Sequence, residues 1–222
     1  MTTWNRRTVL TGACGAALLL LAGLPVHAAD DKGDPYAFVV DLTNAVLEEI
    51  RKDPKLHAAE PARVRALVDT YLLPAADFTM MTRMTVGPKW RQTSPEQKQR
   101  LEKGFQELLI RVYSGALTNV TDERCELRPA RRQPAADEMV IRTLLKSSGK
   151  NDIGIDYRIY RNKAGAWKVV DVNVEGIWMV ENYRSQFASV LSQDGIDGLI
   201  TMLETRTDEL AAKNGSTSVG TK

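Results

Sequence analysis

The sequence predicts a single α+β domain, with helices first, a curved antiparallel sheet after them and further helices at the end of the chain. Apolar residues recur every three to four positions as far as about residue 122, which indicates amphipathic helices. From about residue 123 they alternate instead, which indicates strands with one buried face. Helical spacing returns after Gly176. The sequence shows neither internal repeats nor a linker, so we expect one domain.

The first 28 residues have the layout of an export signal. Arg6 and Arg7 form a basic start, residues 16–24 are apolar, and residues 26–28 form a small-residue cleavage site. The apolar run is too short to serve as a stable membrane anchor. The paired arginines leave two export routes open, the Sec route and the twin-arginine route. We therefore expect an exported protein whose signal peptide spans residues 1–28.

Removal of this signal changes the composition that bears on function. It takes away two arginines and no acidic residue, so 28 basic residues face 28 acidic ones and the net charge is zero. A nucleic-acid-binding protein would carry a clustered basic face, so that class is not supported. Cys125 is the only cysteine left, so the exported chain is expected to fold without an internal disulfide.

Three main helices are expected before the sheet. The first runs from Pro35 to Pro54, and the second runs from Pro61 to Pro74 with one apolar stripe. A short methionine-rich piece follows. The long third helix begins at "TSPEQ", residues 93–97, in which Ser94 and Gln97 fit a capping box.

Four strands are expected after residue 123, namely "CEL", "EMVIRTLLK", "DIGIDYRIY" and "AWKVVDVNV". On the third and fourth strands, alternation places one set of residues on a common face: Ile153, Ile155, Tyr157, Ile159, Val170, Val172 and Val174. Asp171 then falls on the other face with Trp167 and Val169. Two helices close the domain. Residues 211–222, which end in the polar run "KNGSTSVGTK", are expected to form a disordered tail.

The sequence carries little of the chemistry that enzymes use. The mature chain keeps one histidine, His57, in a polar stretch between prolines where an exposed loop is expected. No spacing of histidine, cysteine or carboxylates fits a metal site, so we predict no catalytic residue, no metal and no cofactor. One alternative stays open, an exported isomerase-type enzyme that acts on a small apolar substrate with Asp171 as its base. A salt bridge from Asp171 to Arg184 explains this carboxylate more simply.

The apolar surface of the chain is large and rich in methionine. One patch gathers Phe78, Met80, Met81 and Met84 beside Trp90, and another gathers Met139, Trp178 and Met179. Methionine adapts its shape to partners that lack one fixed conformation, and an acyl chain is such a partner. Two other readings remain, a core in which methionine closes gaps and an adaptor that binds protein partners without a ligand.

The segment "VEGIWMVENYRSQFASVLSQDGIDGLITML" resembles the C-terminal signature of the MlaC family, also described as toluene-tolerance auxiliary components. The matching residues are Glu175, Gly176, Met179, Tyr183, Arg184, Phe187 and the run 195–199. Further blocks agree in order: "DPYAFV", "VRALVDTYLLPAADF", "VGPKWRQTSPEQKQRLEKGFQELLIRVYSGAL" and "GAWKVVDV". The resemblance covers nearly all of residues 34–205.

This resemblance implies a phospholipid-binding domain over residues 29–210, with the cone-shaped fold of NTF2-like proteins and a hydrophobic cavity for acyl tails. It implies a monomeric periplasmic carrier that holds phospholipid as cargo. Its expected partners are the inner-membrane Mla ABC transporter complex and the outer-membrane Mla lipoprotein–porin complex. Shuttling lipid between them would maintain the lipid asymmetry of the outer membrane.

The residues expected to touch lipid come from the strand face described above and from the helices opposite it. They are Leu72, Phe78, Met81, Met84, Leu108, Val112, Ile155, Tyr157, Ile159, Val170, Val172, Val174, Trp178 and Met179. Trp178 departs from the family pattern, because relatives carry a small residue there. Its ring is expected to narrow the cavity or to reshape its base.

Overall fold

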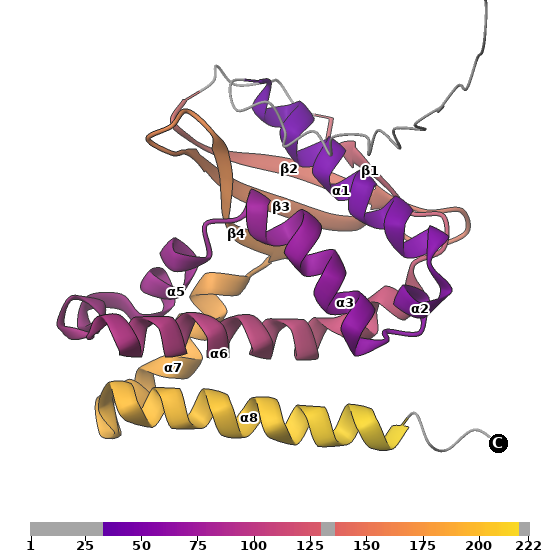
Figure 1. Ribbon diagram of the computed structural model, residues 1–222. Coiled ribbons are helices and arrows are strands. Elements are labelled where there is room, and N and C mark those ends of the chain that lie inside the picture. Colours follow the sequence, from indigo (N-terminus) through magenta and orange to yellow (C-terminus); the bar gives the residue numbers. More distant parts are fainter. Residues whose placement is uncertain (1–32, 130–135, 218–222) are drawn as a thin grey trace, which may run out of the picture.

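The computed structural model describes residues 33–129 and 136–217 (Figure 1). The predicted signal peptide at 1–28 and the last residues of the predicted tail, 218–222, lie outside the described residues. Helices occupy the first half of the described chain, a five-stranded antiparallel sheet follows, and two helices end it. The predicted α+β class and order of elements are therefore confirmed.

Helix α1 (Pro35–Lys52) begins where its N-cap, Asp34, accepts a hydrogen bond of 3.0 Å from the backbone N–H of Tyr36. A short helix α2 (Pro54–His57) follows directly. The prediction of an exposed loop at His57 was wrong. This residue ends α2, is half-buried and is hydrogen-bonded through its ring to the carbonyl oxygen of Val120.

The predicted helix from Pro61 to Pro74 is built from three pieces. Helix α3 (Pro61–Leu67) continues into a π-helical turn η1 (Val68–Leu72) and then into the single turn α4 (Leu73–Ala75). Pro74 lies inside α4 and does not end the helix. The wider π turn starts a new helical segment, and proline is tolerated in a first turn because its missing N–H breaks no bond there.

Helix α5 (Phe78–Val86) leads through a 3₁₀ turn η2 (Gly87–Gln92) to the long helix α6 (Pro95–Tyr113) and the 3₁₀ turn η3 (Ser114–Asn119). The predicted capping box of α6 is confirmed. Ser94 Oγ accepts a hydrogen bond of 3.1 Å from the backbone N–H of Gln97. Gln97 Oε1 in turn accepts one of 3.1 Å from the backbone N–H of Ser94.

The sheet is antiparallel throughout and follows chain order. Its strands are β1 (Arg124–Leu127), β2 (Glu138–Lys146), β3 (Ile153–Arg161), β4 (Trp167–Val174) and β5 (Ile177–Trp178). The short strand β5 was not predicted. It forms because Glu175 and Gly176, both at positive φ, make a tight turn that returns the chain against β4. Helix α1 packs on one face of the sheet, over β1 and β2 (Figure 1).

A β-bulge corrects the predicted faces of β4. Arg158 pairs with Asp171 whereas the next residue, Ile159, pairs with Val169, so Val170 is an extra residue without a partner. The alternation therefore shifts by one position at the bulge. Val169 shares the buried face of Ile159, and Val172 and Val174 continue that face beyond the bulge. Asp171 lies on the opposite face, away from Val169.

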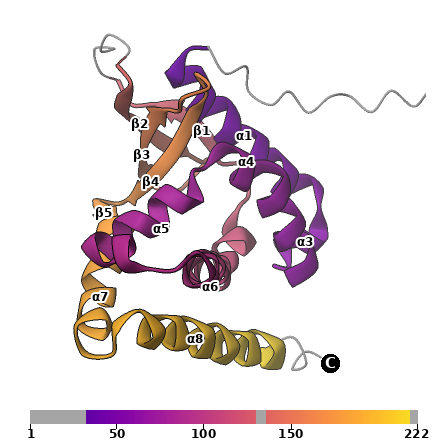
Figure 2. The same cartoon turned by 60° about the vertical axis from the view of Figure 1, so that its left-hand side comes forward.

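Helix α7 (Met179–Gln193) and helix α8 (Gly195–Thr217) close the chain, and α8 lies alongside α6 (Figures 1 and 2). Helices α6 and α8 approach each other closely at Gly104, where an added Cβ atom would lie 3.0 Å from the Cβ of Leu203. Helix α8 continues to Thr217, so the predicted tail does not begin at residue 211. The sequence places two alanines there, at 211 and 212, and alanine favours a helix.

Three groups of buried side chains form the core, and each joins different elements. The aromatic cluster joins α5, η2, α6, α7 and α8 and contains Val86, Trp90, Leu101, Phe105, Leu108, Tyr183, Phe187, Leu191, Leu199, Ile200 and Leu203. The sheet cluster, under α1, contains Val39, Met139, Ile141, Ile159, Trp167 and Val169. The N-terminal cluster, between α1, α2 and α3, contains Ile50, Leu56, Val64 and Leu67.

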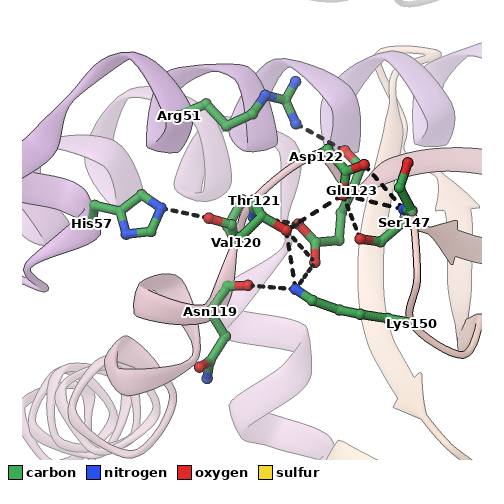
Figure 3. Close-up of polar contacts among 10 residues, drawn as sticks. Arg51, His57, Asn119, Val120, Thr121, Asp122, Glu123, Ser147 and Lys150 are labelled. Atoms are coloured by element: carbon green, nitrogen blue, oxygen red, sulfur yellow. Dashed lines mark hydrogen bonds and ion pairs between the residues drawn. The ribbon is translucent and has the colours of Figure 1, made fainter.

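A polar network fastens the connection between η3 and β1 to its neighbours (Figure 3). The Lys150 ammonium donates hydrogen bonds to Glu123 Oε1 at 2.7 Å and to the carbonyl oxygen of Asn119 at 3.2 Å. Arg51 of α1 donates one of 2.8 Å to the backbone oxygen of Glu123. Burial opposes ionisation of Glu123, but the hydrogen bonds from Lys150 and from the backbone of Thr121 outweigh it and lower the pKa to about 2.

We expect Glu123→Gln to flatten the pH dependence of stability in acid. Because the folded-state pKa lies below the unfolded value of about 4.5, the carboxylate stabilises the fold above that value. This contribution is lost as the pH falls from about 4.5 towards 2. Thermal unfolding at about pH 5 and about pH 3 should show a smaller drop in Tm for the variant than for the wild type. An equal drop in both would mean that Glu123 does not contribute to acid stability.

Candidate functional site

The three clusters leave an apolar cavity of about 260 Å³ between them. Helices α3, α5 and α6 each contribute residues to its lining. Figure 2 shows how these three helices are arranged relative to one another. Its lining consists of Val46, Val64, Leu67, Val68, Leu72, Leu73, Ala76, Phe78, Met81, Gln106, Leu109, Ile110, Tyr113, Ser114, Leu117, Val169 and Met179. We call this space the apolar cavity.

The first wall of the apolar cavity is the helical segment from Val64 to Leu73. Its apolar stripe is the one that the sequence shows, and it crosses from α3 through the π turn into α4. A π turn holds one more residue than an α turn, and such turns occur often at functional sites. This wall therefore combines a continuous apolar face with a local irregularity in the backbone.

The other walls come from elements that are far apart in the sequence. Phe78 and Met81 of α5 face the cavity. Asp77 caps the N-terminus of this helix, where its Oδ1 accepts a hydrogen bond of 2.8 Å from the backbone N–H of Met80. Leu109 and other residues of α6 lie opposite. Val169 of β4 and Met179 at the start of α7 close the end near the sheet.

The lining is apolar apart from Gln106, Tyr113 and Ser114. Among the residues that the structure describes, no charged side chain lines this cavity. Such a surface offers no charged side chain that could anchor an ion. It suits a flexible apolar chain, which needs contact area and adaptable neighbours such as Met81 and Met179.

Four of the predicted lipid-binding residues meet at this cavity: Leu72, Phe78, Met81 and Met179. They come from η1, α5 and α7, so the structure brings together residues from both methionine-rich patches. Their contact with lipid stays a prediction.

The other predicted residues lie elsewhere. Leu108 is buried in the aromatic cluster, Ile159 is buried in the sheet cluster, and Tyr157 and Val172 pack against that sheet cluster. Val170 is the buried residue of the β-bulge. Ile155 is half-buried between its strand partners. The exposed ones are Val112 and Val174.

Trp178 does not line the apolar cavity, so the expectation that its ring narrows this cavity or reshapes its base was wrong. Its ring lies against the guanidinium of Arg158, with 4.6 Å between the ring centroid and Cζ. Arg158 of β3 pairs with Asp171 of β4, and Trp178 of β5 pairs with Asn173, two residues further along β4. The side chains of Arg158, Asp171 and Trp178 therefore lie on the same face of the sheet. Met84 also lies outside the cavity, in a cleft beyond α5.

Asp171, the alternative catalytic base, is buried and already bonded. Its Oδ1 accepts hydrogen bonds of 2.9 Å from the backbone N–H groups of Val172 and Val180, and its Oδ2 lies 3.5 Å from Arg158 Nη1. The expected salt bridge to Arg184 is therefore replaced by one to Arg158. Burial raises the pKa of the Asp171 carboxyl, while the Val180 N–H and the Arg158 charge oppose that rise. These contacts join β4 to the first turn of α7.

Sequence reasoning missed most of the cavity wall. Val64, Leu67 and Val68 were visible as an apolar stripe, but a stripe does not reveal whether it faces a core or a cavity. Leu109 lies one position from the predicted Leu108 on α6, and only the packing of α8 against this helix decides which of them faces the cavity. Val169 was missed because the bulge is not visible in the sequence.

Across residues 33–129 and 136–217, no group of three histidine, cysteine, aspartate or glutamate side chains is arranged to hold a metal ion. In the same part of the chain, no helix combines the length and the apolar character needed to cross a membrane.

Cys125 is buried in β1, and burial raises the pKa of its thiol.

Fold and cavity together define a class: an α+β domain whose helices and antiparallel sheet surround an apolar cavity. The family model described as MlaC protein matches residues 40–205. The chain belongs to the MlaC family.

The relatives agree with this assignment. The chain is 26% identical over 188 residues to the intermembrane phospholipid transport system binding protein MlaC of Haemophilus influenzae, covering 84% of this chain and 88% of that one. It is 26% identical over 183 residues to the toluene tolerance protein ttg2D of Pseudomonas putida, covering 81% and 83%. A phospholipid-binding protein from Ralstonia solanacearum, solved in complex with a phospholipid, superimposes with a TM-score of 0.76 at 37% identity, covering 81% of this chain and 99% of that chain.

Proposed function

We propose that this protein is a periplasmic phospholipid carrier that holds acyl tails in the apolar cavity. The observation that supports it most is the cavity itself, which lacks a charged group among the described residues and lies between α3, α5 and α6. A relative at 37% identity was solved with a phospholipid bound. The predicted export signal would bring the protein to the compartment between the two membranes.

An apolar cavity without a strong grip on a head group suits exchange. Burying an acyl chain gains about 0.8 kcal/mol per methylene relative to water. The gain relative to a bilayer is near zero, because the tails in a bilayer are already out of water. Loading and unloading are then closely balanced, and the direction of transfer is set by the membrane complexes that the carrier meets.

These complexes are the outer-membrane Mla lipoprotein–porin complex and the inner-membrane Mla ABC transporter. In this proposal the carrier acts as a monomer, takes up one phospholipid at a time and uses no cofactor. Its action would maintain the lipid asymmetry of the outer membrane.

The cavity must widen to take a whole lipid. Its volume of about 260 Å³ lies just below the roughly 300–1,000 Å³ of pockets that enclose drug-sized ligands. The wall from Val64 to Leu73 is the part suited to move, because it is exposed on its outer side and contains the π turn. Leu72 is already 39% exposed, so water reaches this edge of the cavity.

The test is native mass spectrometry of the mature protein purified without detergent, followed by solvent extraction of bound molecules. We expect about one phospholipid per chain. Without detergent or a membrane, the acyl tails could leave the cavity only into water, which is strongly unfavourable. A mass without lipid, unchanged after incubation with phospholipid vesicles, would contradict the proposal. The family member would then act as an adaptor between protein partners.

A further inference from the structure

A second, larger cleft of about 1,040 Å³ lies outside the helix pair α5 and α7, where these helices meet the face of the sheet that carries Asp171. It is lined by Arg83, Met84, Gly87, Pro88, Trp90, Arg91, Arg158, Asp171, Val180, Glu181, Arg184, Ser185 and Ala188. We call it the arginine cleft, because its lining contains four arginines, from four different elements, and two acidic residues.

Only one of these arginines is used by the fold. Arg158 is half-buried, faces Asp171 and stacks on Trp178. Arg83, Arg91 and Arg184 are exposed, and none of the three forms an ion pair with another described residue. The Arg184 guanidinium lies beside Gly87, where an added Cβ would be 3.9 Å from its Nε and Nη2 atoms.

Three unpaired cations around one cleft repel each other, so their gathering does not stabilise the fold. The exposed glutamate of the cleft, Glu181, does not form an ion pair with any of them in the described structure. The mature chain as a whole has no net charge, so this surplus is a local feature and not a consequence of a basic composition. Guanidinium groups left free in a concave surface are suited to bind anions.

The arginine cleft is separate from the apolar cavity. The two share no lining residue, because α5 and α7 pack against each other between them. Phe78 and Met81 of α5 face the cavity, whereas Arg83 and Met84 of the same helix face the cleft. A phospholipid whose tails fill the cavity would therefore not place its phosphate among these arginines.

We propose that the arginine cleft binds an acidic segment of a partner protein. Clustered arginines recognise carboxylates through paired hydrogen bonds, which lysines cannot reproduce. Trp90 and Met84 add apolar area between the charges, and arginine, tryptophan and methionine are the residues enriched in protein interfaces. The size of the cleft fits a stretch of polypeptide better than a single phosphate. This proposal does not depend on what the apolar cavity holds.

The test measures fluorescence anisotropy of a fluorescein-labelled peptide of alternating aspartate and glutamate. We expect binding that weakens with added salt, and at least about a tenfold higher Kd for the triple variant Arg83→Gln, Arg91→Gln, Arg184→Gln. The matched control removes the same charge from exposed sites outside the cleft: Arg124→Gln, Arg142→Gln, Arg206→Gln. Its Kd should stay within about twofold of the wild type.

Three results would overturn the proposal. Equal weakening in both triple variants would show that only net charge matters. Absence of peptide binding at low salt, together with binding of anionic phospholipid vesicles that the cleft variant loses, would make the cleft a membrane contact. Complete displacement of the peptide by inorganic phosphate at physiological ionic strength would make it a phosphate site. Lipid content measured on the cleft variant should equal that of the wild type, which separates this test from that of the carrier function.

Discussion

Replacing Leu72 with glutamate is expected to abolish co-purification of phospholipid and to leave the fold intact. Leu72 lines the apolar cavity yet is 39% exposed, so the new carboxylate can stay hydrated in the empty protein. The cost to folding should be about 1 kcal/mol or less. In the loaded protein an acyl tail would strip water from that charge, at a cost of several kcal/mol. Since each 1.4 kcal/mol is a factor of ten, lipid occupancy should fall by at least about 100-fold.

Val112→Glu is the matched control for this substitution. Val112 is 43% exposed and lies on α6, but it does not line the cavity. The same charge there should leave both the lipid content and the Tm close to those of the wild type. Lipid extraction measures the phospholipid content of both variants, and thermal unfolding measures their Tm. If Leu72→Glu still carries phospholipid in wild-type amount, the acyl tails do not lie in this cavity.

The fold was largely predictable because local patterns agree with tertiary structure in this chain. Prolines and capping residues mark the helix starts, and the switch from helical to alternating spacing marks the sheet. The failures occur where one residue changes the geometry. The π turn before Leu73 and the bulge at Val170 each insert one residue into a regular element. Such insertions are set by packing, and single-sequence periodicity carries no signal for them.

The candidate site was predictable only in part, for a related reason. A cavity is lined by the same residue types as a core, so composition does not separate Met81, at the cavity, from Leu108, in the core. The face of β4 was assigned by strict alternation, and the bulge moved Val169 to the cavity side in place of Val170. The arginine cleft was not predicted, because its four arginines are spread over about a hundred residues and only the fold brings them together.

Phe105→Ala is expected to be among the most destabilising single substitutions in this protein. Phe105 is fully buried at the centre of the aromatic cluster, with its ring centroid 5.2 Å from Tyr183 and 5.7 Å from both Phe78 and Phe187. Truncation removes these edge-to-face and tilted contacts and leaves a cavity where α6 and α7 meet. The free energy of unfolding should fall by about 3–5 kcal/mol. Chemical denaturation monitored by circular dichroism measures it.

Two further variants separate the loss of packed volume from the loss of aromatic contacts. Phe105→Leu fills most of the space without aromatic contacts and should lose less, about 1–2 kcal/mol. Ile177→Ala removes apolar atoms from a residue that is 62% exposed and should change stability by less than about 0.5 kcal/mol. Equal losses for Phe105→Ala and Ile177→Ala would mean that the aromatic cluster does not hold α6 and α7 together. Because Phe78 touches both Phe105 and the apolar cavity, Phe105→Ala should also loosen one wall of this cavity. If acyl tails lie there as proposed, lipid should leave this variant faster than it leaves Phe105→Leu.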